Sequence, residues 1–350
     1  MFSLTGEHIE VVIRSWLIWE LTHSLNWLMV MVFMHWIPHT LIAIPAGSIA
    51  ERVNRQRLIM WAEVLLSVAA LGMFITTYLG IMNPYWMGGM LVLYNIAGSL
   101  SNPCRQLLIH DMVGHEHLLS GVALTSSLRF ATMSIGKPFG GFILLYFGAA
   151  WGFFVNALMF LPLILVLLTV IRITQKEISE ETKQHPFEEF KQGLGYMKGQ
   201  RTILATMGIA TTPGIFIGSG FSPFLAAYSD TVLGMGAKGY TFFITAIGVG
   251  AMIGAASLGW VGKVQWKGKM LFLGIIGYCI SVFAFAYSKS IVLSMAALAL
   301  LGFSEVMQNS AATTMLLGKV PSDMRGRMMG IFNFSRLGLR VVNGPFLLGS

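Results

Sequence analysis

The chain has 350 residues, of which 55% are hydrophobic and only 11% are charged. A soluble domain carries about 25% charged residues, so the excess of apolar side chains indicates contact with a bilayer, as do repeated apolar runs of about 20 residues. The net charge of +8 is divided among alternate loops, which argues against a nucleic-acid partner. Cys104 and Cys279 lie in apolar segments and form neither a disulfide framework nor a zinc pattern. We expect an all-α integral membrane protein with no cofactor and no metal.

Nine apolar segments are long enough to cross a bilayer as helices. A partial segment precedes them at Met1–Thr22, and another follows at Met328–Ser350. The nine predicted helices, in chain order, are Leu25–Ala50, Leu58–Gly80, Trp86–Ile109, Leu119–Phe147, Ala149–Ile171, Thr202–Tyr228, Gly239–Gly262, Met270–Tyr287 and Ile291–Leu317.

Basic residues are concentrated in every second link between these helices, so the positive-inside rule places those links in the cytoplasm. The longest polar stretch, Arg172–Arg201, reads as a cytoplasmic linker with a short amphipathic helix around Pro186–Met197. It divides the chain into an N-terminal helical bundle (residues 1–171), the linker (residues 172–201) and a C-terminal bundle (residues 202–350).

A faint internal repeat relates the two bundles. Three residues of the first half match three of the second at one constant offset, and loop sidedness agrees, which favours parallel repeats. The matched residues are Asn102, Val113 and Arg129 in the first half, and Asn309, Val320 and Arg336 in the second.

The link between the first two complete helices reads GSIAERVNRQR, from Gly47 to Arg57. It resembles the signature between helices 2 and 3 of the major facilitator superfamily, Gly-x-Leu-Ala-Asp-Arg-x-Gly-Arg-(Lys/Arg). Asn54 replaces a glycine, and both residues tolerate a left-handed turn. The residues that match outright are Gly47, Ala50, Arg52 and Arg55, and those that differ are Ile49, Glu51, Asn54 and Gln56.

Other stretches extend the resemblance along the chain. WLIWELTHS, VPSDMRGRMMG and FSPFLAAYSDTVLGMGAKGYTFFITAIGVGAMIGA look like the bacterial efflux branch of the superfamily, which includes siderophore and macrolide exporters. The resemblance implies two pseudo-symmetric six-helix bundles in a bacterial inner membrane. Because the family has twelve helices, we expect a chain that begins inside helix 1, ends inside helix 11 and lacks helix 12.

The family assigns the helix 2–3 loop to a conformational latch. Gly47 permits close helix approach, and Glu51 can meet the positive N-terminus of a neighbouring helix, which the resemblance places near Met328. Arg52 and Arg55 can hold this contact by charge-assisted hydrogen bonds. The alternative is that these arginines only anchor the loop on the cytoplasmic side.

Charged residues inside apolar segments are the candidates for a proton or substrate path, because each needs a partner or a cavity. Glu7, Glu10 and Arg14 crowd the first segment, and Glu10 and Arg14 are spaced to pair along one helix face. They form either part of the path or a structural ion pair. Glu305 lies near the middle of Ile291–Leu317, close to Gln308 and Asn309, and is either a proton site or a hydrogen-bonded core acid.

Polar residues on other segments complete the candidates. Asn95 and Asn102 lie on the helix that corresponds to the fourth of the family, while Arg105 is close enough to its cytoplasmic end to snorkel. Arg129 and Arg336 are repeat-related and lie deeper, which favours pairing with acids or gating.

SIGKPFGGFI resembles the helix-5 motif of exporters, in which Gly136, Gly140 and Gly141 allow tight helix packing. Lys137 stands where proline is usual, which weakens an antiporter assignment. The histidine-rich segment His110–His117 is expected to be a solvated cytoplasmic turn rather than a metal site.

Together these features predict a secondary transporter that exports an amphipathic small molecule, a drug or a siderophore, in exchange for protons by alternating access. We expect a monomer without enzymatic activity, whose partners are the substrate, protons and the lipid bilayer. The alternatives are an importer of a nutrient or siderophore with the same fold, and a membrane sensor or scaffold that transports nothing. A membrane enzyme that uses the histidine segment ranks behind both.

Overall fold

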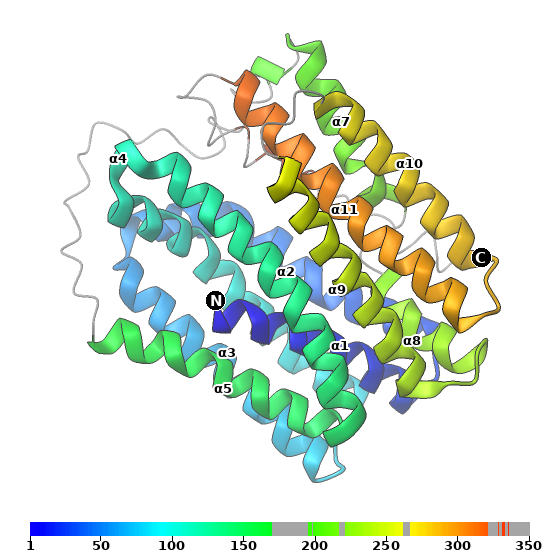
Figure 1. Ribbon diagram of the computed structural model, residues 1–350. Helices are drawn as coiled ribbons and strands as arrows, with labels where there is room; N and C mark the ends of the chain where they lie inside the picture. Colours follow the sequence, from blue (N-terminus) through cyan, green and yellow to red (C-terminus); the bar gives the residue numbers. More distant parts are fainter. Residues whose placement is uncertain are drawn as a thin grey trace. The chain divides into compact units, whose positions relative to one another are not determined.

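The computed structural model describes residues 1–169, 195–197, 199–216, 221–261, 267–320, 328, 331–332 and 335. It separates into two compact units, unit 1 (Met1–Lys183) and unit 2 (Gln184–Ser350). Each unit is a bundle of α-helices (Figure 1). The division falls within the segment that we predicted to be the linker, most of which lies outside the described residues, including nearly all of the amphipathic helix expected at Pro186–Met197.

The described part of unit 1 contains five helices, and its chain turns between them at residues suited to helix ends. The side chain of Asn83 accepts a hydrogen bond from the Trp86 backbone N–H and Pro84 occupies the first turn, so α4 begins there. Gly148, with a φ of 84°, separates α4 from α5 in a conformation that favours glycine. The helices are α1 (Phe2–Thr22), α2 (Leu25–Arg52), α3 (Arg55–Tyr78), α4 (Pro84–Phe147) and α5 (Ala149–Thr169).

The first segment, which we predicted to be partial, forms a helix of 21 residues. At 1.5 Å per residue, α1 is about 32 Å long, close to the thickness of a bilayer core.

Helix α4 has 64 residues and reverses direction within its length. Arg105 donates to Ser3 at 3.0 Å, while a Cβ on Gly136 would lie 2.9 Å from the carbonyl oxygen of Thr5. Along a straight helix Arg105 and Gly136 would be about 46 Å apart, so α4 must fold back between them. Figure 1 shows this reversal beside the α4 label.

The two limbs of α4 occupy the places of two predicted helices, but the polar turn expected at His110–His117 is wrong. The backbone stays helical through this segment. Its sequence has one glycine, Gly114, and no proline, so every residue of the segment keeps the backbone N–H that a helix needs.

Unit 2 is built around α11. This helix packs against α9 and α10, and α7 contacts both α10 and α11. The span that we predicted at Thr202–Tyr228 corresponds to two helices, with residues 217–220 outside the described part of the chain. The described helices are α7 (Arg201–Phe216), α8 (Phe221–Thr231), α9 (Gly236–Val261), α10 (Lys267–Ala286) and α11 (Ile291–Lys319).

Glycines allow α11 to approach both neighbours closely. A Cβ on Gly250 of α9 would overlap the carbonyl oxygen of Ala299, and one on Gly302 of α11 would overlap that of Ile247. On the α10 side, a Cβ on Gly274 would lie 3.1 Å from the backbone nitrogen of Gln308. Unit 2 therefore uses the small-residue packing typical of membrane helices.

Five described helices, or parts of them, are long and apolar enough to cross a membrane: α3, α5, Gly236–Leu258, Gly268–Ala286 and Ile291–Leu316. Large apolar side chains such as Trp61, Leu165 and Phe272 are more than half exposed on these helices. An apolar surface of this kind is suited to lipid.

Candidate functional site

A buried charge network joins three helices of unit 1. Arg105 on α4 forms an ion pair and a hydrogen bond with Glu63 on α3, whose side chain is 0% exposed. The same guanidinium donates to Ser3 on α1 at 3.0 Å, and Ser3 donates to the second carboxylate oxygen of Glu63 at 2.9 Å. Glu7 lies 3.9 Å from Arg105 at the partly exposed edge of the network.

The network corrects our interpretation of Arg105 as a snorkelling residue. Its side chain is only 19% exposed, and its charge is used inside the bundle because Glu63 would otherwise be a buried charge without a partner. Sequence analysis missed Glu63, although an acid within the apolar run LIMWAEVLLSVAALG is itself the signal of an intramembrane functional or structural group.

Glu10 and Arg14 form the ion pair that their spacing predicted. The Arg14 Nε atom donates to Glu10 at 2.6 Å, and the two side chains are 4% and 1% exposed. Both lie on α1, so the pair does not by itself fix one helix against another.

The polar candidates on the first limb of α4 have local contacts. Asn95 is buried and donates to the Leu91 carbonyl at 2.8 Å. Ser99, one turn later, lies 2.8 Å from His39 on α2 and donates to the Asn95 carbonyl. Asn102 is partly buried on the same limb.

The second limb of α4 packs against α1 through glycines. Gly136 faces Thr5 and His8, and a Cβ on Gly140 would lie 3.1 Å from the Cα atom of Ile9. The three glycines proposed as a packing motif, Gly136, Gly140 and Gly141, therefore lie on the limb that approaches the helix carrying Glu7, Glu10 and Arg14.

The helix 2–3 loop is shorter than its motif. Glu51 and Arg52 belong to the last turn of α2, and Gly47 lies in the turn before it. The side chains of Glu51 and Arg52 lie outside the described part. Asn54, although asparagine tolerates a left-handed turn, has an extended conformation and caps α3 by accepting from the Arg57 backbone N–H. A side-chain oxygen at this position satisfies a free N–H of the first helical turn.

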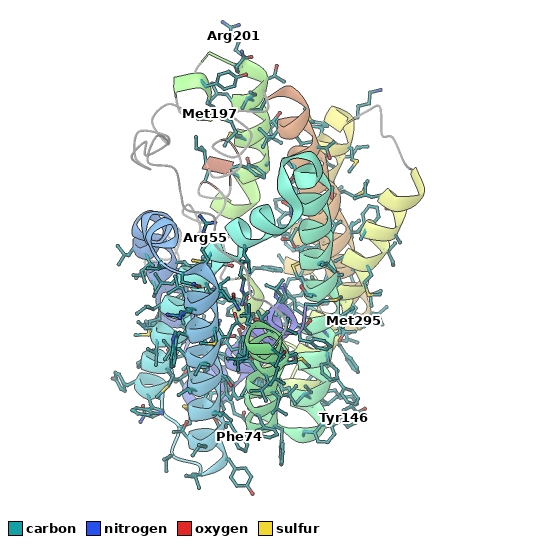
Figure 2. The ribbon with its side chains drawn as sticks, turned by 90° about the vertical axis from the view of Figure 1, so that its left-hand side faces the viewer. Arg55, Phe74, Tyr146, Met197, Arg201 and Met295 are labelled. Atoms are coloured by element: carbon teal, nitrogen blue, oxygen red, sulfur yellow. The ribbon has the colours of Figure 1, made fainter. Side chains whose placement is uncertain are left out.

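The end of the motif also binds α5. Gln56 donates to the Leu167 carbonyl at 2.7 Å, so it satisfies a backbone acceptor near the C-terminal end of that helix. Figure 2 shows Arg55 at one end of α3, with Phe74 near the other end of the same helix.

Aromatic side chains gather at the end of unit 1 where Phe74 and Tyr146 lie (Figure 2). Phe74 contacts Trp151 and Phe154 at ring-centroid distances of 5.9 and 5.0 Å, and Tyr146 stacks against Phe142 at 4.7 Å. Aromatic residues concentrate at membrane–water interfaces, so this end is suited to the interface opposite Arg55.

In unit 2, Gln308 ties α11 to α7. Its amide lies 3.3 Å from the Ile209 carbonyl and 3.4 Å from that of Ala210. Pro213 has no N–H to give to the Ile209 carbonyl four residues earlier, and Gln308 supplies the missing donor. Glu305 is partly buried one turn before, and Asn309 is 5% exposed.

Several predicted residues lie beyond what the structure describes. Arg129 belongs to α4, but its side chain, like those of His110–His117, is not among the described ones, and Arg336 is outside the described residues altogether. Within the described part of the chain, histidine, cysteine and acidic side chains form no group of three that could hold a metal.

Two units of apolar, membrane-length helices, one of them with ion pairs buried among its helices, are characteristic of secondary membrane transporters. Comparison with known proteins agrees with this class and names the family. A family model of the major facilitator superfamily, described as "Transmembrane secretion effector", matches residues 1–350. The chain therefore belongs to this family and is an integral membrane transporter of the major facilitator superfamily.

Relatives and solved structures support the family and the fold. The chain is 23% identical over 291 residues to the enterobactin exporter of Shigella boydii serotype 18, which covers 82% of this chain and 67% of the relative. The exporter from Escherichia coli O1:K1 matches to the same extent. The fold is similar to a D-xylose–proton symporter, with a TM-score of 0.71, 15% identity, and coverage of 98% of this chain and 86% of the other. A bacterial homologue of the human lysosomal transporter Spinster has a TM-score of 0.66, 14% identity, and coverage of 98% and 77%.

Proposed function

We propose that this protein exports an amphipathic small molecule, a drug or a siderophore, from a bacterial cytoplasm in exchange for protons. The observation that carries the proposal is the match of all 350 residues to a family described as secretion effectors. Relatives named as enterobactin exporters support the siderophore class and the outward direction. The protein would act as a monomer in the inner membrane, with its basic loops in the cytoplasm.

The proposed mechanism is alternating access, in which units 1 and 2 rock about a site near the middle of the membrane. Glu10, Arg14 and Glu305 are proposed to contact protons or substrate. A buried charged or polar group in a membrane helix is costly, so it is expected to have a partner or a role in transport. Further groups proposed to line the path or to gate it are Glu7, Asn95, Asn102, Asn309, Arg129 and Arg336.

The latch between conformations is proposed to involve Gly47, Glu51, Arg52 and Arg55. Its location is supported by the end of α2 and the start of α3, which place all four residues within two adjoining helix termini. A carboxylate at such a membrane face can bind the positive end of another helix in one conformation and release it in the other.

The proton-coupled export can be tested in an efflux-deficient bacterium that expresses the complete open reading frame. Accumulation of fluorescent drugs and of siderophores would be compared with and without a protonophore. We expect lower accumulation on expression, reversed by the protonophore and abolished in Glu51→Ala and Glu305→Gln. Glu20→Gln is the matched control, because Glu20 is an exposed acid near the end of α1.

Opposite results would identify the alternatives. Higher accumulation on expression would make the protein an importer, and no change in any substrate would favour a sensor or scaffold. Export that persists in the presence of the protonophore would exclude coupling to protons.

A further inference from the structure

Unit 1 contains a second polar cluster, distinct from the Arg105 network. Among the described residues, four buried side-chain atoms have no hydrogen-bond partner there: Oε2 of Glu10, the hydroxyl oxygen of Tyr94, and both amide atoms of Asn156. Glu10 and Asn156 are 0% exposed and Tyr94 is 4% exposed. Buried polar groups in native proteins nearly always have a partner, so three such side chains on α1, α4 and α5 require an explanation.

The three side chains converge on one place. A Cβ on Gly6 would lie 2.7 Å from Oδ1 of Asn156, and Glu10 follows Gly6 by one turn on the same face of α1. Tyr94 packs against Phe160, one turn after Asn156, with ring centroids 6.0 Å apart. Its hydroxyl interacts with Asn156 and lies within electrostatic range of Glu10, but the geometry of a hydrogen bond to Asn156 is not met.

The donors and acceptors of the cluster select its ligand. Glu10 Oε2 and Asn156 Oδ1 accept hydrogen bonds, the Asn156 Nδ2 group donates, and the tyrosine hydroxyl does both. A cation would satisfy only the acceptors, and an anion only the donors. Because Arg14 already pairs with Glu10, the cluster also has no net charge that would attract an ion. Water both donates and accepts and therefore matches it.

The cluster lies at a close contact between α1 and α5. A Cβ on Gly6 would also lie 3.0 Å from the Cβ atom of Met159. The four atoms are enclosed by protein in this conformation, which at Glu10 favours contact with protons over contact with substrate.

We propose that Glu10, Tyr94 and Asn156 bind ordered water inside unit 1. This water is the hydrogen-bond partner of all three side chains, including the Glu10 carboxylate. If Glu10 exchanges protons, as the proposed function requires, this water is the molecule that contacts its carboxylate oxygen Oε2. The groups that surround this water are Arg14 on α1, Tyr94 on α4 and Asn156 on α5. The charges of Glu7, Glu63 and Arg105 lie within electrostatic range of Tyr94.

Radiolytic hydroxyl labelling of the complete protein in detergent tests the binding of water. Hydroxyl radicals formed from bound water oxidise the side chains beside it, even when those side chains are buried. We expect Tyr94 to be oxidised several-fold faster than Phe243, after correction for intrinsic reactivity. Phe243 is 0% exposed and lies among aromatic rings.

Two variants locate the water. Asn156→Leu removes the amide at similar size and should reduce Tyr94 oxidation several-fold, whereas Asn309→Leu, a matched change at a buried asparagine of unit 2, should leave it unchanged. If Asn156→Leu does not fold, Gly6→Ala tests the same point, because the added methyl group would lie 2.7 Å from Oδ1 of Asn156 and displace its amide. Oxidation of Tyr94 no faster than that of Phe243, or unaffected by the folded variant, would overturn the proposal. Labelling is measured without transport, so failure of the export experiment leaves this result independent.

Discussion

In unit 1 the contacts between helices include ion pairs and hydrogen bonds that meet at α1, whereas in unit 2 α11 approaches its neighbours through glycines. Arg105 joins α1, α3 and α4 through Ser3 and Glu63. Gly250, Gly274 and Gly302 instead bring backbones together. Charged contacts require one geometry because a displaced partner leaves a buried charge, while glycine contacts depend only on surfaces remaining close. Unit 1 therefore adds buried charged partners to its own glycine contacts at Gly136 and Gly140, whereas α11 of unit 2 depends mainly on close approach.

The largest effect is expected from breaking the ion pair of unit 1. Arg105→Gln leaves Glu63 buried without its partner and should destabilise the protein by about 3–5 kcal/mol. Thermal unfolding can be followed by the reaction of a thiol-specific dye with Cys104, which is buried until the unit opens, in a background that lacks Cys279. The double variant Glu63→Gln/Arg105→Gln should recover much of the loss. Equal destabilisation of the single and double variants would contradict the pairing.

In unit 2 we expect the next largest loss of stability from adding a methyl group at a glycine that contacts a neighbouring helix. Gly250→Ala places a Cβ against the Ala299 carbonyl, and relief of this overlap should cost about 1–3 kcal/mol. Gly208→Ala is the control, since a Cβ there meets nothing within 4 Å and alanine favours helix by about 0.5–1 kcal/mol. Opposite shifts of the unfolding temperature are expected, and shifts of the same sign would show that α9 and α11 are not held by close approach.

The one polar tie described between α11 and α7 should have a smaller effect. Gln308→Leu removes a donor shared by two carbonyls at 3.3 and 3.4 Å. Interhelical hydrogen bonds in membranes average about 0.6 kcal/mol. Adding Pro213→Ala, which restores an N–H for the Ile209 carbonyl, should reverse the loss in a double-mutant cycle. Additive effects would mean that Gln308 does not compensate for the proline.

The smallest effect expected is at Ser67, which donates to the Ala157 carbonyl at 3.1 Å between α3 and α5. Ser67→Ala should cost no more than about 0.6 kcal/mol, because the carbonyl keeps its place in a helix. Chemical unfolding that shows a loss comparable to that of Arg105→Gln would end the distinction between charged and neutral contacts in unit 1.

The sequence predicted what depends on local pattern. The predicted spans Leu58–Gly80, Ala149–Ile171 and Met270–Tyr287 agree with α3, α5 and α10 to within three residues at each end. The spacing of Glu10 and Arg14 predicted their pair. The resemblance of the Gly47–Arg57 link predicted the family, which the match over the whole chain confirms.

What the sequence did not predict depends on contacts between distant residues. Glu63 and Arg105 are far apart along the chain, and only the packing of α3 against α4 brings them together. Without Glu63 as its partner, Arg105 was interpreted as a residue that snorkels to the cytoplasmic interface. In the same way, the polar residues of His110–His117 suggested a turn, although the backbone there is helical. The composition of a segment therefore does not identify which distant residue contacts a given side chain.

The pairing of Glu10 with Arg14 bears on the order in which the protein is made. Both residues are synthesised within one turn of α1, so this helix can enter the bilayer with those two charges already matched. Glu63 has no such partner in α3. Its partner Arg105 is available only after the ribosome has synthesised the first limb of α4. We therefore expect α1 to insert on its own, while α3 becomes secure in the membrane only once the first limb of α4 has followed it.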